Sequence, residues 1–196
     1  RLVGSGVLSF GPVYHLLNAF PATRLMVVGG IDITTGSFSH TGGTVTIDEN
    51  VTANITNYAL SNGTMTGAGT FNITGTFTWS SGTLSGLGIT SVASNGSWQT
   101  VGTKTFDTRT YRNQGTTVWS DGGPVTALNG AKVDNQTGAA FTITGNSNFL
   151  WSSGAAPSFQ NSTGATLTRN TSTGTAKFTF PLKNTGTVSI ATGTLE

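Results

Sequence analysis

The chain has 196 residues and a formal net charge of +2, and only 8% of its residues are charged, against roughly 25% in an ordinary globular protein. It contains no Cys, which excludes disulfides and thiolate metal sites. The Lys and Arg residues are scattered, so we expect no nucleic-acid surface, which needs clustered basic residues. No run of 18 apolar residues is present to span a membrane.

The first 30 residues differ in composition from the rest. The stretch Gly6–Gly30 is the most apolar part of the chain and has few Thr, whereas Thr and Gly recur every few residues after it. Pro12, Pro21 and Arg24 interrupt this stretch, which argues against a simple targeting segment. We predict that residues 1–30 are an apolar leader that caps the fold or serves in assembly. Residues 31–196 then form one repetitive body.

Short runs of alternating apolar and polar residues fill the body. Examples are GTVTI (43–47), GTFNITGTFTW (69–79), AFTITG (140–145), ATLTR (165–169) and GTVSI (186–190). Period two indicates half-buried strands. A Gly precedes most of these runs, and Gly takes positive φ at a tight corner without steric cost. Nothing after residue 30 has a helical period, so the composition and the pattern predict an all-β protein.

One phrase occurs four times and suggests the architecture. It reads YRNQGT from Tyr111, VDNQTGA from Val133, FQNSTGA from Phe159 and LKNTGT from Leu182. The Asn residues of the phrase follow one another at 22, 26 and 23 residues. Such periods are typical of solenoids. We predict a parallel β-helix (β-solenoid) with about 22–26 residues per coil. An antiparallel sandwich also has short strands, but it gives no reason for a repeated phrase.

The last half of the chain resembles a known repeat style. The string from NQTGAAFTITG to PLKNTGTVSIATGTLE is similar to repeats of large secreted bacterial right-handed β-helix proteins, of the adhesin and autotransporter-passenger type. The resemblance covers roughly residues 103–196. It implies a parallel β-helix that is secreted or displayed at the cell surface. The resemblance is to a repeat style and not to a characterised enzyme, so it bears on fold and location more than on activity.

The repeated Asn has a structural and a glycan interpretation. An inward Asn at a corner can stack on its equivalents and satisfy backbone groups there, so we predict a ladder of Asn113, Asn135, Asn161 and Asn184. Of these, only Asn135 and Asn161 match the N-x-[ST] glycan acceptor pattern, so the acceptor pattern is not what repeats. Surface glycans are predicted instead at acceptor sequences outside the phrase: Asn50, Asn54, Asn62, Asn72, Asn95 and Asn170.

A second phrase is marked by Trp. WSSG begins at Trp79 and at Trp151, and WSDG begins at Trp119. We expect these three rings to stack inward at the edges of the coils. Stacking on sugar rings is the alternative role of an exposed Trp.

An active site on this chain would need clustered acids, and acids are few. Asp107 and Asp134 are 27 residues apart and could approach on neighbouring coils. With Arg109 and Arg112 they form the alternative prediction, a site for acidic polysaccharides. The acidic run at Asp48 lacks the spacing of a Ca²⁺ loop. We therefore expect no catalytic, cofactor or metal site.

Three functions fit these patterns. The first is a non-catalytic extracellular β-solenoid, a fibre, stalk or adhesive module that self-associates through its ends and its N-terminal segment. The second is a β-helix that binds or degrades carbohydrate. The third is a phage fibre or tailspike-like segment, which would be an intertwined trimer.

Overall fold

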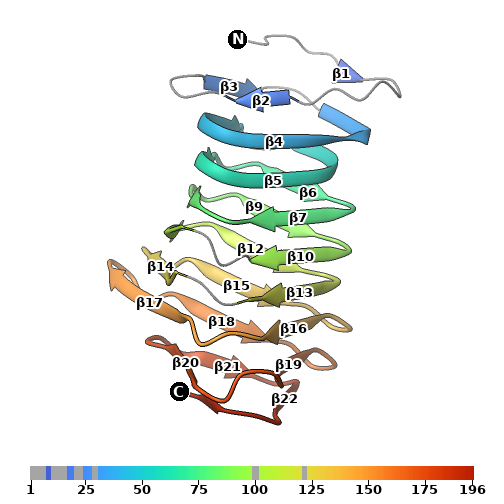
Figure 1. Cartoon of the computed structure of the whole chain (residues 1–196). Helices are drawn as coiled ribbons and strands as arrows, with labels where there is room; N and C mark the ends of the chain where they lie inside the picture. The colour runs from blue at the N-terminus through green and yellow to red at the C-terminus, as the bar shows by residue number, and fades with distance from the viewer. Residues whose placement is uncertain (1–7, 10–16, 20–23, 28–30, 99–101, 121–122) are drawn as a thin grey trace.

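The structure is a computed structural model, and it describes residues 8–9, 17–19, 24–27, 31–98, 102–120 and 123–196. These residues contain no helix. Their strands pair in parallel and wind into a β-solenoid of about seven turns (Figure 1). The predicted fold class is therefore confirmed.

Each coil from residue 70 onward has three strands, and each strand pairs with the third strand after it along the chain. The stack therefore has three parallel sheets. The first sheet contains β6 (Thr70–Ile73), β9 (Ile89–Val92), β12 (Thr110–Asn113), β15 (Lys132–Asn135), β18 (Ser158–Asn161) and β21 (Leu182–Asn184). The second contains β7 (Thr76–Trp79), β10 (Asn95–Trp98), β13 (Thr116–Trp119), β16 (Ala140–Ile143), β19 (Thr166–Arg169) and β22 (Thr187–Ile190). The third contains β8 (Gly82–Leu84), β11 (Lys104–Asp107), β14 (Val125–Leu128), β17 (Asn148–Ser153), β20 (Thr175–Phe178) and β23 (Thr194–Leu195).

The first part of the solenoid has longer strands. Strands β4 (Ile31–Ile47) and β5 (Thr52–Thr66) each run around a whole coil and pair with each other in parallel. Three short strands, β1 (Leu8–Ser9), β2 (Leu17–Ala19) and β3 (Arg24–Val27), pair in parallel with β4. They extend the pairing toward the N-terminus. The proposed capping role of the leader stays a prediction, because residues 1–7, 10–16, 20–23 and 28–30 lie outside the described residues.

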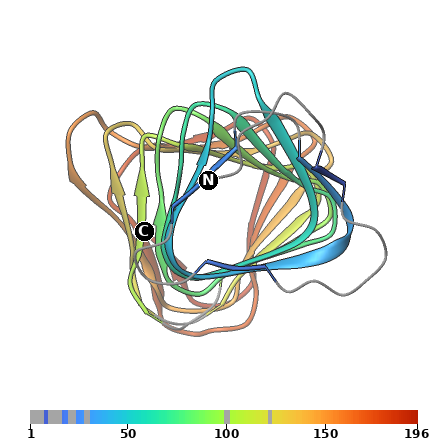
Figure 2. The same ribbon diagram turned by 90° about the horizontal axis from the view of Figure 1, so that it is seen from above.

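Coil length changes along the stack. The later coils match the predicted 22–26 residues, but Asn54 stacks on Asn72 after 18 residues and Asn57 on Thr76 after 19. A shorter coil results where the corner between the second and third sheets is tight. Two residues, Ser80 and Ser81, connect β7 to β8, whereas five residues, 170–174, connect β19 to β20. Figure 2 shows the coils superposed along the axis, with loops that project from an early coil near residue 50 and from later coils.

Alternate side chains of every sheet point into a narrow core. Strand β7 shows the pattern, with Phe77 and Trp79 fully buried and the two Thr residues between and before them at the surface. Aromatic rings stack from coil to coil: the ring centres of Tyr58 and Phe77 lie 5.9 Å apart, nearly parallel. Farther along, Trp119 packs edge-on against Phe149 at 5.8 Å. Such inward columns fill the solenoid without leaving a thick core.

Corners bring successive coils into backbone contact. At Gly115 a Cβ atom would come within 2.1 Å of the Ser94 carbonyl oxygen of the preceding coil, so only Gly fits there. Gly138 has no neighbour within 4 Å of such an atom, but its φ of 82° favours Gly for its backbone conformation. The Gly residues in the repeated phrase therefore serve two different physical needs.

Candidate functional site

The four repeated Asn residues lie in one inward column of the first sheet. Nδ2 of Asn113 donates to Oδ1 of Asn135 at 2.8 Å, Asn135 donates likewise to Asn161 at 2.8 Å, and Asn161 to Asn184 at 2.7 Å. The same amides also donate to backbone carbonyls at the start of the second-sheet strands of the next coil: Ala140 O, Thr166 O and Thr187 O. Each amide thus joins its own coil to the next by two hydrogen bonds.

The ladder has a defined start. Oδ1 of Asn113 accepts from Thr117 Oγ1 at 3.0 Å, and in the preceding coil Val92 occupies the equivalent register position. At the other end, Asn184 is exposed and its Nδ2 donates to Gly186 O of its own coil. A side chain that donates and accepts at once satisfies the polar groups of a buried corner, so the geometry gives this column a structural role.

The Asn residues that match the glycan acceptor pattern differ in how deeply they are buried. Asn135 and Asn161 are fully buried, so neither can carry a glycan in the folded chain. The candidates outside the phrase are more accessible: Asn50, Asn62, Asn95 and Asn170 are exposed. Asn54 and Asn72 are half-buried, and Asn72 Nδ2 donates to Asn54 Oδ1 at 2.9 Å. Glycosylation at these six positions stays a prediction.

The three Trp phrases are not equivalent. Trp79 and Trp119 are buried at matching positions of the second sheet, and Trp98 lies between them in register. Trp151 belongs to the third sheet and is 45% exposed. The expectation of an inward ring is wrong for Trp151 because the pairing of β14 with β17 shifts register there: Trp151 pairs with the inward Ala127, but Ser153 rather than Ser152 pairs with Leu128. This bulge leaves the ring outside.

The four residues of the predicted polysaccharide site do not converge. Arg112 and Asp134 form an ion pair at 3.6 Å on the first sheet, and Lys132 also lies 3.6 Å from Asp134. Asp107 lies at the corner after the third sheet, where Thr108 and Asn129 donate to its Oδ1 at 2.8 Å. Arg109 is fully buried and points into the solenoid. That predicted constellation is therefore wrong as a single site.

Arg109 instead has a role inside the stack that sequence reasoning missed. Its Nε donates to Thr90 Oγ1 at 2.7 Å, and its two NH groups donate to the carbonyls of Gly67, Ser85, Gly69 and Ile89. All five N–H groups of the guanidinium find acceptors. Burial lowers the pKa of Arg109 to about 10, so the group stays protonated at neutral pH. Arg109 stands at the register position of Gly69 and Gly88 in the two preceding coils, where the backbones approach too closely for a Cβ atom, and its side chain reaches the carbonyls of those coils.

The other buried titratable groups include a His–Tyr pair and a Lys. His40 Nδ1 lies 2.6 Å from Tyr58 Oη, and burial lowers the pKa of His40 and raises the pKa of Tyr58. Lys104 is fully buried, burial lowers its pKa to about 8, and its Nζ has no hydrogen-bond partner among the described residues. Neither arrangement contains the pair of carboxylates that most glycoside hydrolases use.

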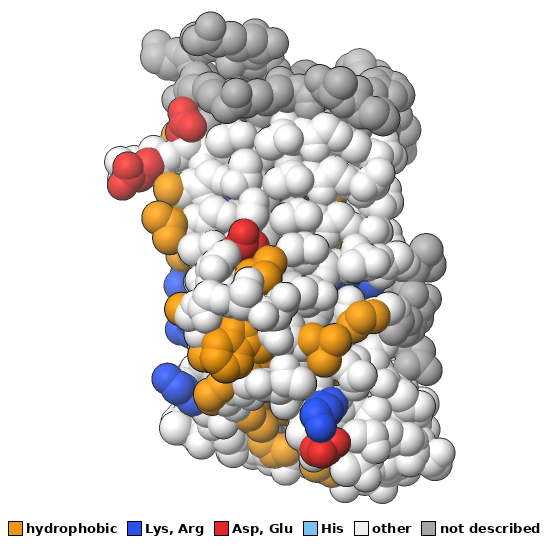
Figure 3. Space-filling view, turned by 90° about the vertical axis from the view of Figure 1, so that its left-hand side faces the viewer, with side chains coloured by type: hydrophobic (Ala, Val, Ile, Leu, Met, Phe, Trp, Pro, Cys, Tyr) orange, Lys and Arg blue, Asp and Glu red, His pale blue; other side chains and the backbone are white. Residues whose placement is uncertain are grey.

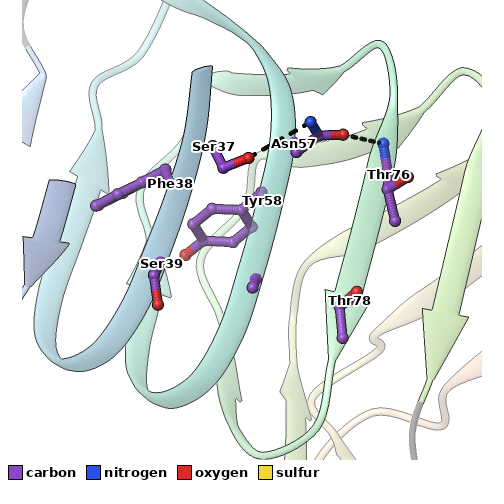
Figure 4. Close-up of a pocket in the computed structure, with 8 residues that line it drawn as sticks. Ser37, Phe38, Ser39, Asn57, Tyr58, Thr76 and Thr78 are labelled. Atoms are coloured by element: carbon purple, nitrogen blue, oxygen red, sulfur yellow. Dashed lines mark hydrogen bonds between the residues drawn. The ribbon is translucent and has the colours of Figure 1, made fainter. Parts of the chain in front are cut away.

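The surface of the second sheet has a shallow hollow of about 200 Å³. Figure 4 shows Asn57 bridging the hollow, with its Nδ2 toward Ser37 Oγ and its Oδ1 accepting from Thr76 N. Tyr58 and Phe38 form its base. Its lining contains no carboxylate or amine, and the phenol of Tyr58 is already bonded to His40. Hydroxyl and amide groups therefore supply the polar part of this lining.

The described residues contain no cluster of three His, Asp or Glu side chains that could hold a metal ion. None of the described segments is a helix long and apolar enough to cross a membrane. Comparison with protein-family models, with curated proteins and with solved structures found no match.

Proposed function

We propose that the protein is a non-catalytic extracellular structural module, a β-solenoid that forms part of a surface fibre, stalk or adhesive rod. The observation that carries the proposal is the continuous column of Asn amides, which joins four successive coils through side chains as well as backbone. Side-chain bonds that add to the backbone bonds between the same coils stiffen a rod. The resemblance to repeats of secreted bacterial β-helix proteins supports the extracellular location.

Assembly through the ends is proposed from the general behaviour of solenoid coils, whose open strand edges pair with another coil. In the chain of residues 1–196, strands β21, β22 and β23 pair with the preceding coil, and Ile190 is 46% exposed. For this chain, the proposed partner of that edge is the first coil of a second copy.

The test is the state of assembly in solution. Sedimentation velocity and negative-stain electron microscopy of the purified chain should show end-to-end rods whose length grows with protein concentration. Ile190→Lys places a charge on the edge and should shorten the rods. Leu87→Lys is the matched control, because Leu87 is 78% exposed at a corner, away from this edge.

Two results would contradict end-to-end assembly. One is a monodisperse monomer at every concentration tested. The other is a trimer with the chains intertwined, which would favour the tailspike-like alternative. Equal effects of Ile190→Lys and Leu87→Lys would point to a general loss of stability instead of an edge contact.

A further inference from the structure

Strand β17 departs from the pattern of the other third-sheet strands. Its bulge places Ser152 outside the pairing and turns Trp151 to the surface, although the paired Ala127 is fully buried. The core at this level is filled by other rings, since Phe180 packs edge-on against Phe149 at 4.7 Å. Bulges that re-aim a side chain occur preferentially beside functional sites.

The exposed indole is held in place. Its Nε1 donates to Ser153 O at 3.2 Å, and the backbone N–H of Trp151 donates to Thr179 Oγ1 at 2.6 Å. A flat ring with a fixed orientation loses little conformational entropy when a ligand stacks on it. This distinguishes Trp151 from Leu87, which is more exposed but offers no flat face.

Polar groups next to Trp151 are connected to it across three coils. Asn129 N donates to the same Ser153 O at 3.1 Å, and Asn129 Nδ2 donates to Asp107 Oδ1 at 2.8 Å. Coils in a parallel stack are about 4.8 Å apart, so the set from Asp107 to Ser153 spans about 10 Å. Asn129 is exposed and Asp107 half-buried, which leaves an amide and a carboxylate accessible beside the ring.

The same corner holds unusual backbone. Thr108 has a φ of 65° and Asn129 a φ of 50°. A β-branched residue in the left-handed region is a true outlier, and such strain clusters at ligand sites. Thr108 Oγ1 donates to Asp107 Oδ1, so the strained residue also positions the carboxylate. Bulge, exposed ring, carboxylate and strain thus coincide on one edge of the third sheet.

We propose that Trp151, Asn129 and Asp107 form a binding site for a neutral oligosaccharide. A pyranose ring has an apolar C–H face that stacks on an indole and a rim of hydroxyls that bond to amide and carboxylate oxygens. The only charge in the bonded set is negative, so an acidic sugar is repelled. Figure 3 shows the side of the molecule that carries β14 and β17, where hydrophobic side chains lie among mostly uncharged polar ones. This site is separate from the proposed end-to-end contact.

The test is binding of the whole chain to an array of immobilised neutral and acidic oligosaccharides. The wild-type chain should bind neutral members of the array and not acidic ones. Trp151→Ala should weaken that binding roughly tenfold or more, and Asp107→Asn severalfold. Trp151→Phe keeps a ring and should retain part of the affinity. Leu87→Ala is the control that should bind as the wild type does.

Iodide quenching of fluorescence gives an independent readout. Trp151→Phe removes the fluorescence of the exposed indole. In the wild type, a bound oligosaccharide should protect that part of the fluorescence from quenching by iodide. No binding to any neutral glycan, or equal binding by wild type and Trp151→Ala, would overturn the proposal. Loss of self-association in Trp151→Ala, without any glycan binding by the wild type, would instead identify a contact between copies. Trp151→Ala should still assemble into rods, because the glycan site and the end-to-end contact are separate surfaces.

Discussion

The early and late coils of the solenoid fill the same inner column in different ways. In the early coils the fourth position of the first sheet holds Ile55, Ile73 and Val92, all buried. From Asn113 onward it holds Asn, and the amides bond to one another. The first arrangement depends on apolar burial, and the second on hydrogen bonds that are complete only while every neighbour is present. A parallel β-solenoid can therefore change its interior chemistry from coil to coil without changing its register.

Polar groups in the two halves also differ in their partners. The late coils have a buried column of paired amides, and their buried Arg169 donates to carbonyls of nearby loops. Arg109 instead reaches back into the early coils and donates to their carbonyls. Lys104, on the strand before it, has no hydrogen-bond partner among the described residues. Substitutions at these positions test how far each half depends on its buried polar groups.

The largest effect is expected for Arg109→Met. Removing the guanidinium deprives four carbonyls and one hydroxyl of a donor inside the solenoid, and we expect a loss of about 3 kcal/mol in the free energy of unfolding. Urea unfolding followed by circular dichroism measures it. Arg109→Lys, which keeps the charge but has fewer donors, should lose less. A change in stability near zero for Arg109→Met would mean that water satisfies these carbonyls.

The next effect concerns the middle of the ladder. Asn135→Leu leaves Oδ1 of Asn161 without its donor and removes the acceptor of Asn113. We expect a loss of about 2 kcal/mol in the free energy of unfolding. Asn184→Leu is the control. Because Asn184 is exposed at the end of the ladder, its substitution should lower the free energy of unfolding by less than about 1 kcal/mol. If both variants lose the same amount, the ladder is not a cooperative column.

Lys104 gives a pH-dependent comparison. The pKa of Lys104 is lowered to about 8 by burial, so between pH 8 and its unfolded-state pKa the unfolded chain binds more protons and the stability of the wild type rises with pH. Below pH 8 the cost of burying the charged amine is present in full. Lys104→Met should therefore be more stable than the wild type at pH 7, by about 1 kcal/mol. The difference in urea midpoint between the two proteins should shrink as the pH approaches 10.

The smallest effect is expected where the two halves meet. Val92 pairs in register with Asn113, so Val92→Asn adds one amide to the start of the ladder. Its Nδ2 would donate to Oδ1 of Asn113, which now accepts from Thr117. The apolar burial lost and the bond gained are similar in size, so stability should change by less than about 1 kcal/mol. Val92→Ala, which loses the burial without a bond, should cost more. The reverse order would show that the early coils exclude amides.

Much of the fold follows from the repeated phrase. Because the phrase around Asn135 and Asn161 recurs with its Gly, the coil length and the inward position of Asn could be inferred from the sequence. The shorter early coils could not, since they lack the phrase. The bulge beside Trp151 also escaped prediction, because the letters WSSG are identical at Trp79 and nothing in them marks Ser152 as unpaired.

The role of Arg109 had a faint signal. The stretches GAG at 67–69 and GLG at 86–88 repeat at the corner where Arg109 stands one coil later. A large basic residue that follows two Gly residues at matching positions indicates a side chain that donates to the backbone carbonyls of the preceding coils. Alignment of the sequence in segments of one coil each places Gly69, Gly88 and Arg109 in one column. The hydrogen bonds that make the arrangement stable depend on carbonyl directions, which the sequence does not give.

The bonds between coils run along the axis of the solenoid, and this determines how the molecule bears tension. A pull along the axis stretches the backbone and amide bonds of each interface directly, and all bonds of one interface share the load. A pull at one corner instead loads the hydrogen bonds of the interface one after another, so that they break in sequence. The column from Asn113 to Asn184 lies at one such corner, where it adds a bond at the place from which a coil would first peel away.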